Sequence, residues 1–165
     1  MPLLSVLLAA AALSSSVTGL PSGNEAEDLY LGQLATCQES WFDWKDDDRR
    51  MRQYSDRFGT NYTRIEAEPA FLPKLPVKVL GFPLVKVYPQ SVGMGVGFAI
   101  QLDAQFGKIR TEVEERLGRP LECSASDGMT SCGLELGENK TVMLTAFGAG
   151  ADAANLLGCY YYYEK

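Results

Sequence analysis

The feature that most constrains the fold is a strict alternation of bulky and smaller side chains that begins at residue 91. The bulky apolar residues of this stretch are Val92, Met94, Val96, Phe98, Ile100 and Leu102. Successive side chains of a strand point to opposite faces, so the pattern predicts a long strand with one bulky face and one nearly bare face. The next apolar residues are Phe106, Ile109, Val113 and Leu117. Their spacing of three and four residues predicts a helix that ends at Gly118. A strand followed directly by a helix, each with an apolar face, is expected to form the folding core.

The rest of the chain predicts a single disulfide-stabilised domain over residues 34–165, in which helices come first and strands follow. Apolar residues at helical spacing predict one helix over 34–44, and the acidic run Asp46–Asp48 precedes a second over 49–58. Further strands are expected at 62–65, 77–80, 84–88, 141–147 and 156–163 and in a hairpin over 123–132, with 77–80 and 84–88 forming either two short strands or one kinked strand. The sequence therefore predicts an α+β fold, with two N-terminal helices packed on a mostly antiparallel sheet of five or six strands and one inserted helix.

Residues 1–19 are expected to be a signal peptide. The run Leu3–Leu13 is apolar throughout, and Val17 and Gly19 match the small residues before a signal peptidase site. A buried N-terminal helix is the alternative, but the polar segment that follows is typical of a loop, and residues 20–33 are expected to be flexible. The protein is therefore predicted to be periplasmic or secreted, with no stable membrane anchor once the signal is removed.

The four cysteines of an exported chain are expected to form two disulfides. Asp127-Gly128 is typical of a two-residue hairpin turn. That turn places Cys123 opposite Cys132 at a position without backbone hydrogen bonds, where the short Cα separation permits a disulfide. The remaining pair, Cys37 and Cys159, would then join the N-terminal helix to the last strand.

Several functional classes are disfavoured by what the 165-residue chain lacks. It contains no histidine, which excludes the usual serine and cysteine nucleophile machinery and removes the commonest metal ligand. No two cysteines have metal-site spacing, so neither a metal nor a cofactor is expected. Glu112, Glu114 and Glu115 lie away from the apolar stripe of their helix, as solvated charges do. The net charge of −6 argues against nucleic acid as a partner, and the sequence favours a protein that is not an enzyme.

Two groups of residues are candidates for binding. Gly93, Gly95 and Gly97 give the predicted strand its bare face, which either lets a neighbouring group approach the backbone or forms the floor of a groove. Near the C-terminus, Tyr160 and Tyr162 point to the strand face opposite Cys159. Their rings are either exposed as a contact surface or lie over the glycines and cover the backbone.

Three stretches, Cys37–Asp46, Tyr88–Phe98 and Gly158–Lys165, carry a resemblance to a known group. In these motifs the sequence resembles small, uncharacterised exported proteins from xanthomonad-type bacteria, over most of the expected mature chain. The resemblance implies a periplasmic location and no particular activity.

Small size, export, two disulfides and the lack of catalytic side chains favour a non-catalytic binding protein. The leading hypothesis is a protein-binding module of the inhibitor or immunity type whose partner is another exported protein, in an oligomeric state that the sequence does not predict. The alternative is a carrier of a small apolar ligand, held between the helices and the face of Gly93, Gly95 and Gly97. A hydrolase that works without histidine is the third hypothesis.

Overall fold

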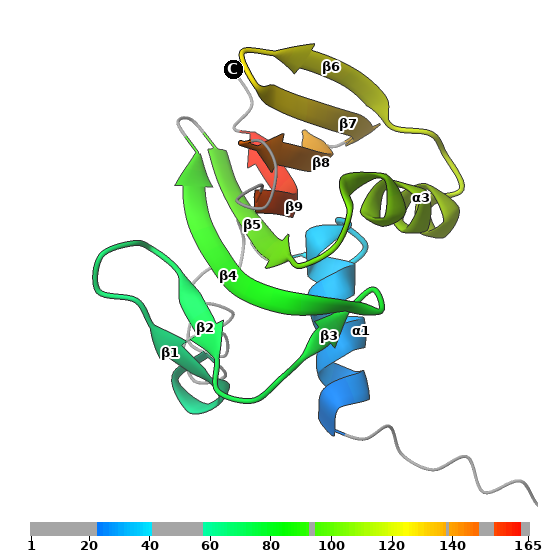
Figure 1. Ribbon diagram of the computed structural model, residues 1–165. Helices are drawn as coiled ribbons and strands as arrows, with labels where there is room; N and C mark the ends of the chain where they lie inside the picture. Colours follow the sequence, from blue (N-terminus) through cyan, green and yellow to red (C-terminus); the bar gives the residue numbers. More distant parts are fainter. Residues whose placement is uncertain (1–22, 41–57, 93–94, 138, 149–153, 163–165) are drawn as a thin grey trace, which may run out of the picture.

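The computed structural model describes residues 23–40, 58–92, 95–137, 139–148 and 154–162, which form an antiparallel sheet of nine strands with helices packed against it (Figure 1). The helices are α1 (Gly23–Ala35) and α3 (Phe106–Leu117), and residues 58–61 are also helical. The strands are β1 (Tyr62–Arg64), β2 (Phe71–Pro73), β3 (Lys78–Val79), β4 (Phe82–Val92), β5 (Gly95–Leu102), β6 (Glu122–Ser126), β7 (Met129–Gly137), β8 (Lys140–Phe147) and β9 (Ala154–Tyr162). Their order across the sheet is β1-β2-β4-β5-β9-β8-β7-β6, and β3 pairs with β4.

The alternating stretch spans the end of one strand and the whole of the next. Val92 ends β4 and pairs with Gly95, which begins β5, so the single strand predicted from residue 91 is in fact part of a hairpin. Within β5 the alternation has the predicted consequence, because Phe98 and Ile100 are fully buried on one face. The predicted helix is confirmed as α3, in which Ile109 and Val113 are buried and Gly118 forms a left-handed C-cap.

One apolar core lies between the sheet and both helices. Leu31 and Leu34 of α1 share a single buried cluster with Ile109 and Val113 of α3. The sheet contributes Val87, Phe98, Ile100, Leu102, Cys132, Leu134, Val142, Leu144, Leu157 and Cys159 to this cluster. Figure 1 shows both helices on the same side of the strands. We call the sheet face toward α1 and α3 the inner face and the opposite one the outer face.

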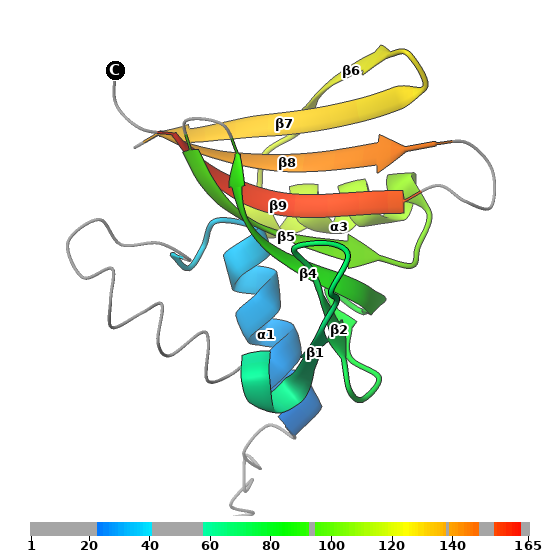
Figure 2. The same cartoon turned by 90° about the vertical axis from the view of Figure 1, so that its left-hand side faces the viewer.

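The register arranges the outer face in rows of residues across neighbouring strands. One row contains Ala99, Gly158, Met143, Gly133 and Glu122. The rows on either side contain Gly97, Tyr160, Thr141 and Glu135, and Gln101, Leu156, Thr145, Ser131 and Ser124. Figure 2 shows β7, β8, β9 and β5 side by side with α3 behind them. Neither α1 nor α3 covers the outer face.

The predicted N-terminal helices are wrong as described. The first helix begins at Gly23 and ends at Ala35, so Leu34 lies in its last turn rather than at its start, and the segment expected to be flexible is helical from residue 23. Leu31 and Leu34 bury the helix against the sheet, and the Asp28 carboxylate accepts a hydrogen bond from the Leu80 N–H at 2.7 Å. These tertiary contacts stabilise the helix, although its polar first half has no apolar residues at helical spacing from which it could have been predicted. Residues 49–57 of the second predicted helix lie outside the described residues, and its last residue, 58, is helical.

The predicted fold class is also wrong, because the sheet has nine strands rather than five or six. The strand that the sequence did not predict is β2, which has three residues and lies among prolines that favour irregular structure, whereas β3 falls within the strand expected at 77–80. It pairs with β4 through Phe71 and Val87, and with β1 on its other side. Pairing of this kind leaves little trace in the local sequence.

Both predicted disulfides are confirmed. Cys37, just after α1, is bonded to Cys159 of β9, and Cys123 of β6 is bonded to Cys132 of β7, with Cα atoms 5.1 and 4.0 Å apart. Two disulfides indicate folding in an oxidising environment. The predicted signal peptide lies outside the described residues. In the part of the chain that is described, no helix is long and apolar enough to span a membrane.

Candidate functional site

The structure brings the predicted tyrosines and glycines together on the outer face. Tyr160 pairs with Gly97 across β9 and β5, and Tyr162 pairs with Gly95. Gly93 lies outside the described residues. The two tyrosines therefore neighbour the glycine positions as the sequence suggested, but they differ from each other in exposure.

Tyr160 covers the backbone, whereas Tyr162 is open to solvent. A Cβ atom added to Gly97 would lie 2.6 Å from Cδ1 of the Tyr160 ring, and one added to Gly158 would lie 3.1 Å from Cε2 of that ring. The ring thus lies across both glycines and fits there only because neither glycine has a side chain. Tyr162 has 42% of its surface exposed. Tyr160 therefore matches the expectation that the rings cover the glycines, and Tyr162 matches the expectation that the rings are exposed.

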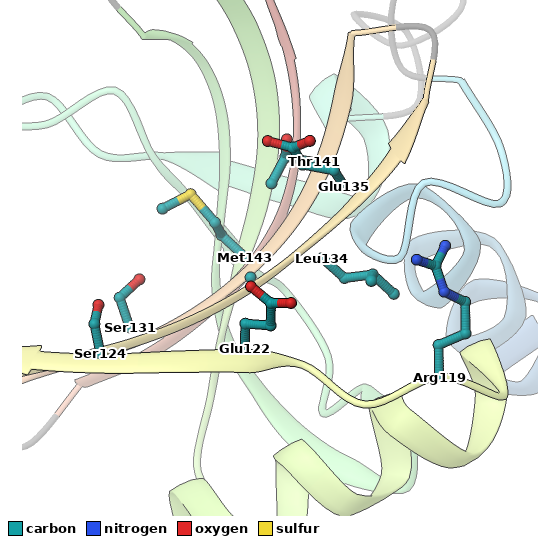
Figure 3. Close-up of a pocket in the computed structure, with 9 residues that line it drawn as sticks. Arg119, Glu122, Ser124, Ser131, Leu134, Glu135, Thr141 and Met143 are labelled. Carbon is teal, nitrogen blue, oxygen red and sulfur yellow. The ribbon is translucent and has the colours of Figure 1, made fainter.

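A groove of about 530 Å³ lies beside this region, over β6, β7 and β8 (Figure 3). It is lined by Arg119, Glu122, Ser124, Ser131, Gly133, Leu134, Glu135, Thr141 and Met143. Within it Glu122 stands opposite Gly133, which has no side chain to fill the space. Thr141 connects the groove to Tyr160, its partner on β9.

The charge of the groove is mostly negative. Glu122 and Glu135 are diagonal neighbours on β6 and β7, on either side of the space above Gly133. Figure 3 shows their carboxylates rising on the same side of the strands, and Arg119 at the rim. Among the described residues neither carboxylate has an ion-pair partner. The groove is therefore suited to a positively charged group rather than to an anion.

The strand that borders the groove is anchored at its start. The Leu121 N–H donates a hydrogen bond to the Glu114 carboxylate at 2.8 Å, and Arg110 Nε donates to the same oxygen at 2.8 Å. Arg110 also donates to the Leu121 carbonyl at 3.5 Å. The Leu121 hydrogen bond and Arg110 lower the pKa of Glu114 below its usual 4.5. This contact fixes the segment between α3 and β6.

Because its pKa is lowered in the folded state, Glu114 is expected to stabilise the protein above pH 4.5 and to lose that contribution as the pH falls through the lowered value. Replacing Glu114 with Gln should therefore reduce the drop in melting temperature between pH 5 and pH 2.5. Thermal unfolding followed by circular dichroism would measure it. Glu112→Gln is the matched control, because Glu112 pairs with Arg116 on the same helix without touching the β6 anchor. Identical acid profiles for wild type and Glu114→Gln would contradict the assignment.

A second polar cluster on β4 was not predicted. Lys86 is ion-paired with Glu68, and the Tyr88 hydroxyl donates a hydrogen bond to Gln101 Oε1 at 3.2 Å. Burial raises the pKa of Tyr88, and the hydrogen bond with Glu68 raises the pKa of Lys86. Both groups therefore keep their protons at neutral pH. The alternation of Lys86 and Tyr88 on one strand face was the sequence signal for it.

The geometry gives no support to the two other functional hypotheses. The carrier required a space between the helices and the glycine face, but α1 and α3 pack against the inner face, whereas Gly97 lies on the outer one. The hydrolase required convergent, buried carboxylates, but Glu112 and Glu114 are ion-paired with Arg116 and Arg110 along α3, and the two groove carboxylates, Glu122 and Glu135, are exposed. Within the described residues no cluster of three or more metal-ligating side chains occurs.

Comparison of the chain with protein-family models, with curated proteins and with solved structures gave no match. The resemblance to exported xanthomonad proteins therefore stays a prediction, and the function has to be argued from the site itself.

Proposed function

We propose that the protein is a non-catalytic exported binding module of the inhibitor or immunity type, which contacts another periplasmic protein through its outer face. The observation that carries the proposal is a sheet face left uncovered by α1 and α3, which has the exposed Tyr162 on β9 and a groove over β6, β7 and β8 whose two carboxylates have no ion-pair partner among the described residues. Tyrosine offers a large contact area at little entropic cost and is enriched in interfaces.

The chemistry of the face supports a protein as the occupant better than a small apolar molecule. Ser124, Ser131 and Thr141 make much of the groove lining hydroxyl-bearing, and Ser131 and Thr145 share a hydrogen bond of 3.1 Å across the strands. A pocket for an apolar ligand is lined predominantly by apolar side chains. The net charge of −6 and the carboxylates of Glu122 and Glu135 favour a basic partner.

The first experiment is native mass spectrometry of the mature protein isolated from the periplasm of its host with both disulfides intact. The proposal predicts a stoichiometric complex with a second protein. A bound apolar small molecule in place of a protein would contradict it and would favour a carrier.

Replacing Tyr162 with Ala is expected to weaken binding of that partner at least tenfold, which corresponds to about 1.4 kcal/mol, because an exposed aromatic residue at the centre of a contact often dominates its energy. The melting temperature should change by less than about 2 °C, since Tyr162 is 42% exposed. Isothermal titration calorimetry and thermal unfolding measure the two quantities.

Tyr160→Ala is the matched comparison, and its expected effect is the reverse. Removing the ring that covers Gly97 and Gly158 should lower the free energy of unfolding by about 2 kcal/mol. If Tyr162→Ala destabilised the fold as much as Tyr160→Ala while leaving binding intact, Tyr162 would not be a contact residue.

A further inference from the structure

The outer edge of β6 is a free strand edge. β6 is the last strand of the sheet order and pairs only with β7. All five of its residues, Glu122–Ser126, are exposed. Figure 1 shows it at the rim of the molecule, and no other strand or helix of the described chain lies along its outer side.

The register identifies which backbone groups this edge offers. In an antiparallel pair, residues that are not hydrogen-bonded to each other direct their N–H and C=O groups outward. The Cys123–Cys132 pair, with a Cα separation of 4.0 Å, is of this kind, and so is the pair two positions on, Ala125–Thr130. Cys123 and Ala125 therefore present two donors and two acceptors to an incoming strand.

The edge is also held rigidly before anything binds. The disulfide joins the second residue of β6 to β7, and the Glu114 and Arg110 contacts hold Leu121 just before the strand. Asp127 and Gly128 close the turn at its end with φ values of 48° and 78°. A strand fixed in this way loses little conformational entropy on pairing, which favours binding.

We propose that β6 accepts an extended, basic segment of the partner protein as an additional strand, with a Lys or Arg side chain beside Glu122 reaching toward Glu135 over Gly133. The inference rests on the proposed function and names how the partner is recognised. Strand addition derives affinity from main-chain hydrogen bonds and specificity from alternate side chains. Side chains of the added strand that face the groove would stand next to Glu122 and Ser124, within reach of the carboxylates of Glu122 and Glu135.

A second copy of the chain is a poorer occupant of the same edge. Each copy carries a net charge of −6, and pairing β6 with β6 would bring two groove regions with Glu122 and Glu135 close together. A basic segment neutralises these carboxylates instead.

The test uses the oxidised mature protein and labelled nonapeptides of alternating Lys and Thr, with binding followed by fluorescence anisotropy. Two further peptides are methylated on the backbone nitrogen, one at every Thr and the other at every Lys. Because successive N–H groups of a strand point to opposite edges, one methylated peptide should lose at least tenfold in affinity and the other should not. A peptide with Glu in place of Lys should not bind. Equal binding of all three Lys peptides, or no binding of any, would overturn the proposal.

Two variants test the same contact from the protein side. Ala125→Pro removes an outward donor without breaking a β6–β7 hydrogen bond and should weaken binding at least tenfold. Gly133→Val fills the groove floor, where an added Cβ meets nothing closer than 3.6 Å, and should weaken binding about fivefold even if the proline variant fails to fold. Glu115→Gln, on α3 away from the groove, is the control and should bind like wild type. Normal binding by both folded variants would contradict strand addition.

The outcomes separate this inference from the proposed function. A natural partner that depends on Tyr162 but not on Ala125 or Gly133 would overturn the strand addition and leave the binding module standing. Peptide binding at β6 without any natural protein partner would overturn the binding module instead. A wild-type dimer that Ala125→Pro dissociates would show that a second copy occupies the edge, and would overturn the basic-segment proposal.

Discussion

Replacing Cys37 and Cys159 together with Ala is expected to lower the free energy of unfolding by about 5 kcal/mol, because this disulfide closes a loop with a sequence separation of 122 residues. Such a cross-link restricts the unfolded chain strongly, and Cys159 is also fully buried. The loss is a large fraction of the stability of an ordinary domain. Urea unfolding followed by circular dichroism would measure it, and the m value should rise as the unfolded chain expands.

The Cys123 and Cys132 pair provides the comparison. Its sequence separation is only 9, so the double Ala variant should lose about 3 kcal/mol and show a smaller change in m value. An equal loss for both pairs would mean that strain or packing, rather than restriction of the unfolded chain, decides what each bond contributes.

Gly158→Ala is expected to destabilise the protein by about 3 kcal/mol although it adds a single methyl group. The added Cβ would lie 2.8 Å from the Phe98 carbonyl oxygen and 2.8 Å from the Ala99 Cβ, so backbone of the neighbouring strand would have to move. Thermal and urea unfolding of the purified variant would quantify the loss.

Gly133→Ala is the matched control on the same sheet face. The nearest heavy atom to its added Cβ is 3.6 Å away, which is ordinary van der Waals contact. The change should be neutral or stabilise the fold by up to about 1 kcal/mol, because Ala restricts the unfolded chain more than Gly does. Equal losses at the two glycines would show that strand propensity, not close packing, governs both.

The correct sequence predictions depended on local chemistry. The part of the alternation that lies in β5 and the helical spacing from Phe106 to Leu117 each reflect one element packing one face into the core. The Asp127-Gly128 turn sets its own register, which is why the Cys123–Cys132 pair could be predicted and why Cys37–Cys159 followed by elimination.

The failures depended on contacts between distant segments. Nothing in the polar start of α1 indicates that Asp28 will bind the Leu80 N–H, and the short strand β2 acquires its conformation by pairing with β4. The different environments of Tyr160 and Tyr162 also needed the three-dimensional structure, since both occupy the same strand face. The groove, by contrast, was within reach of the sequence, because the hairpin register already places Glu122 opposite Gly133.

The position of β9 has a consequence for how the protein is made. This strand follows all the others in the chain, yet it lies between β5 and β8 and carries Cys159. Until it is synthesised, the strands from β1 to β5 and those from β6 to β8 have no common neighbour, and Cys37 has no partner. The two groups of strands can therefore join into one sheet only after residues 154–162 have been synthesised, whatever hairpins form earlier.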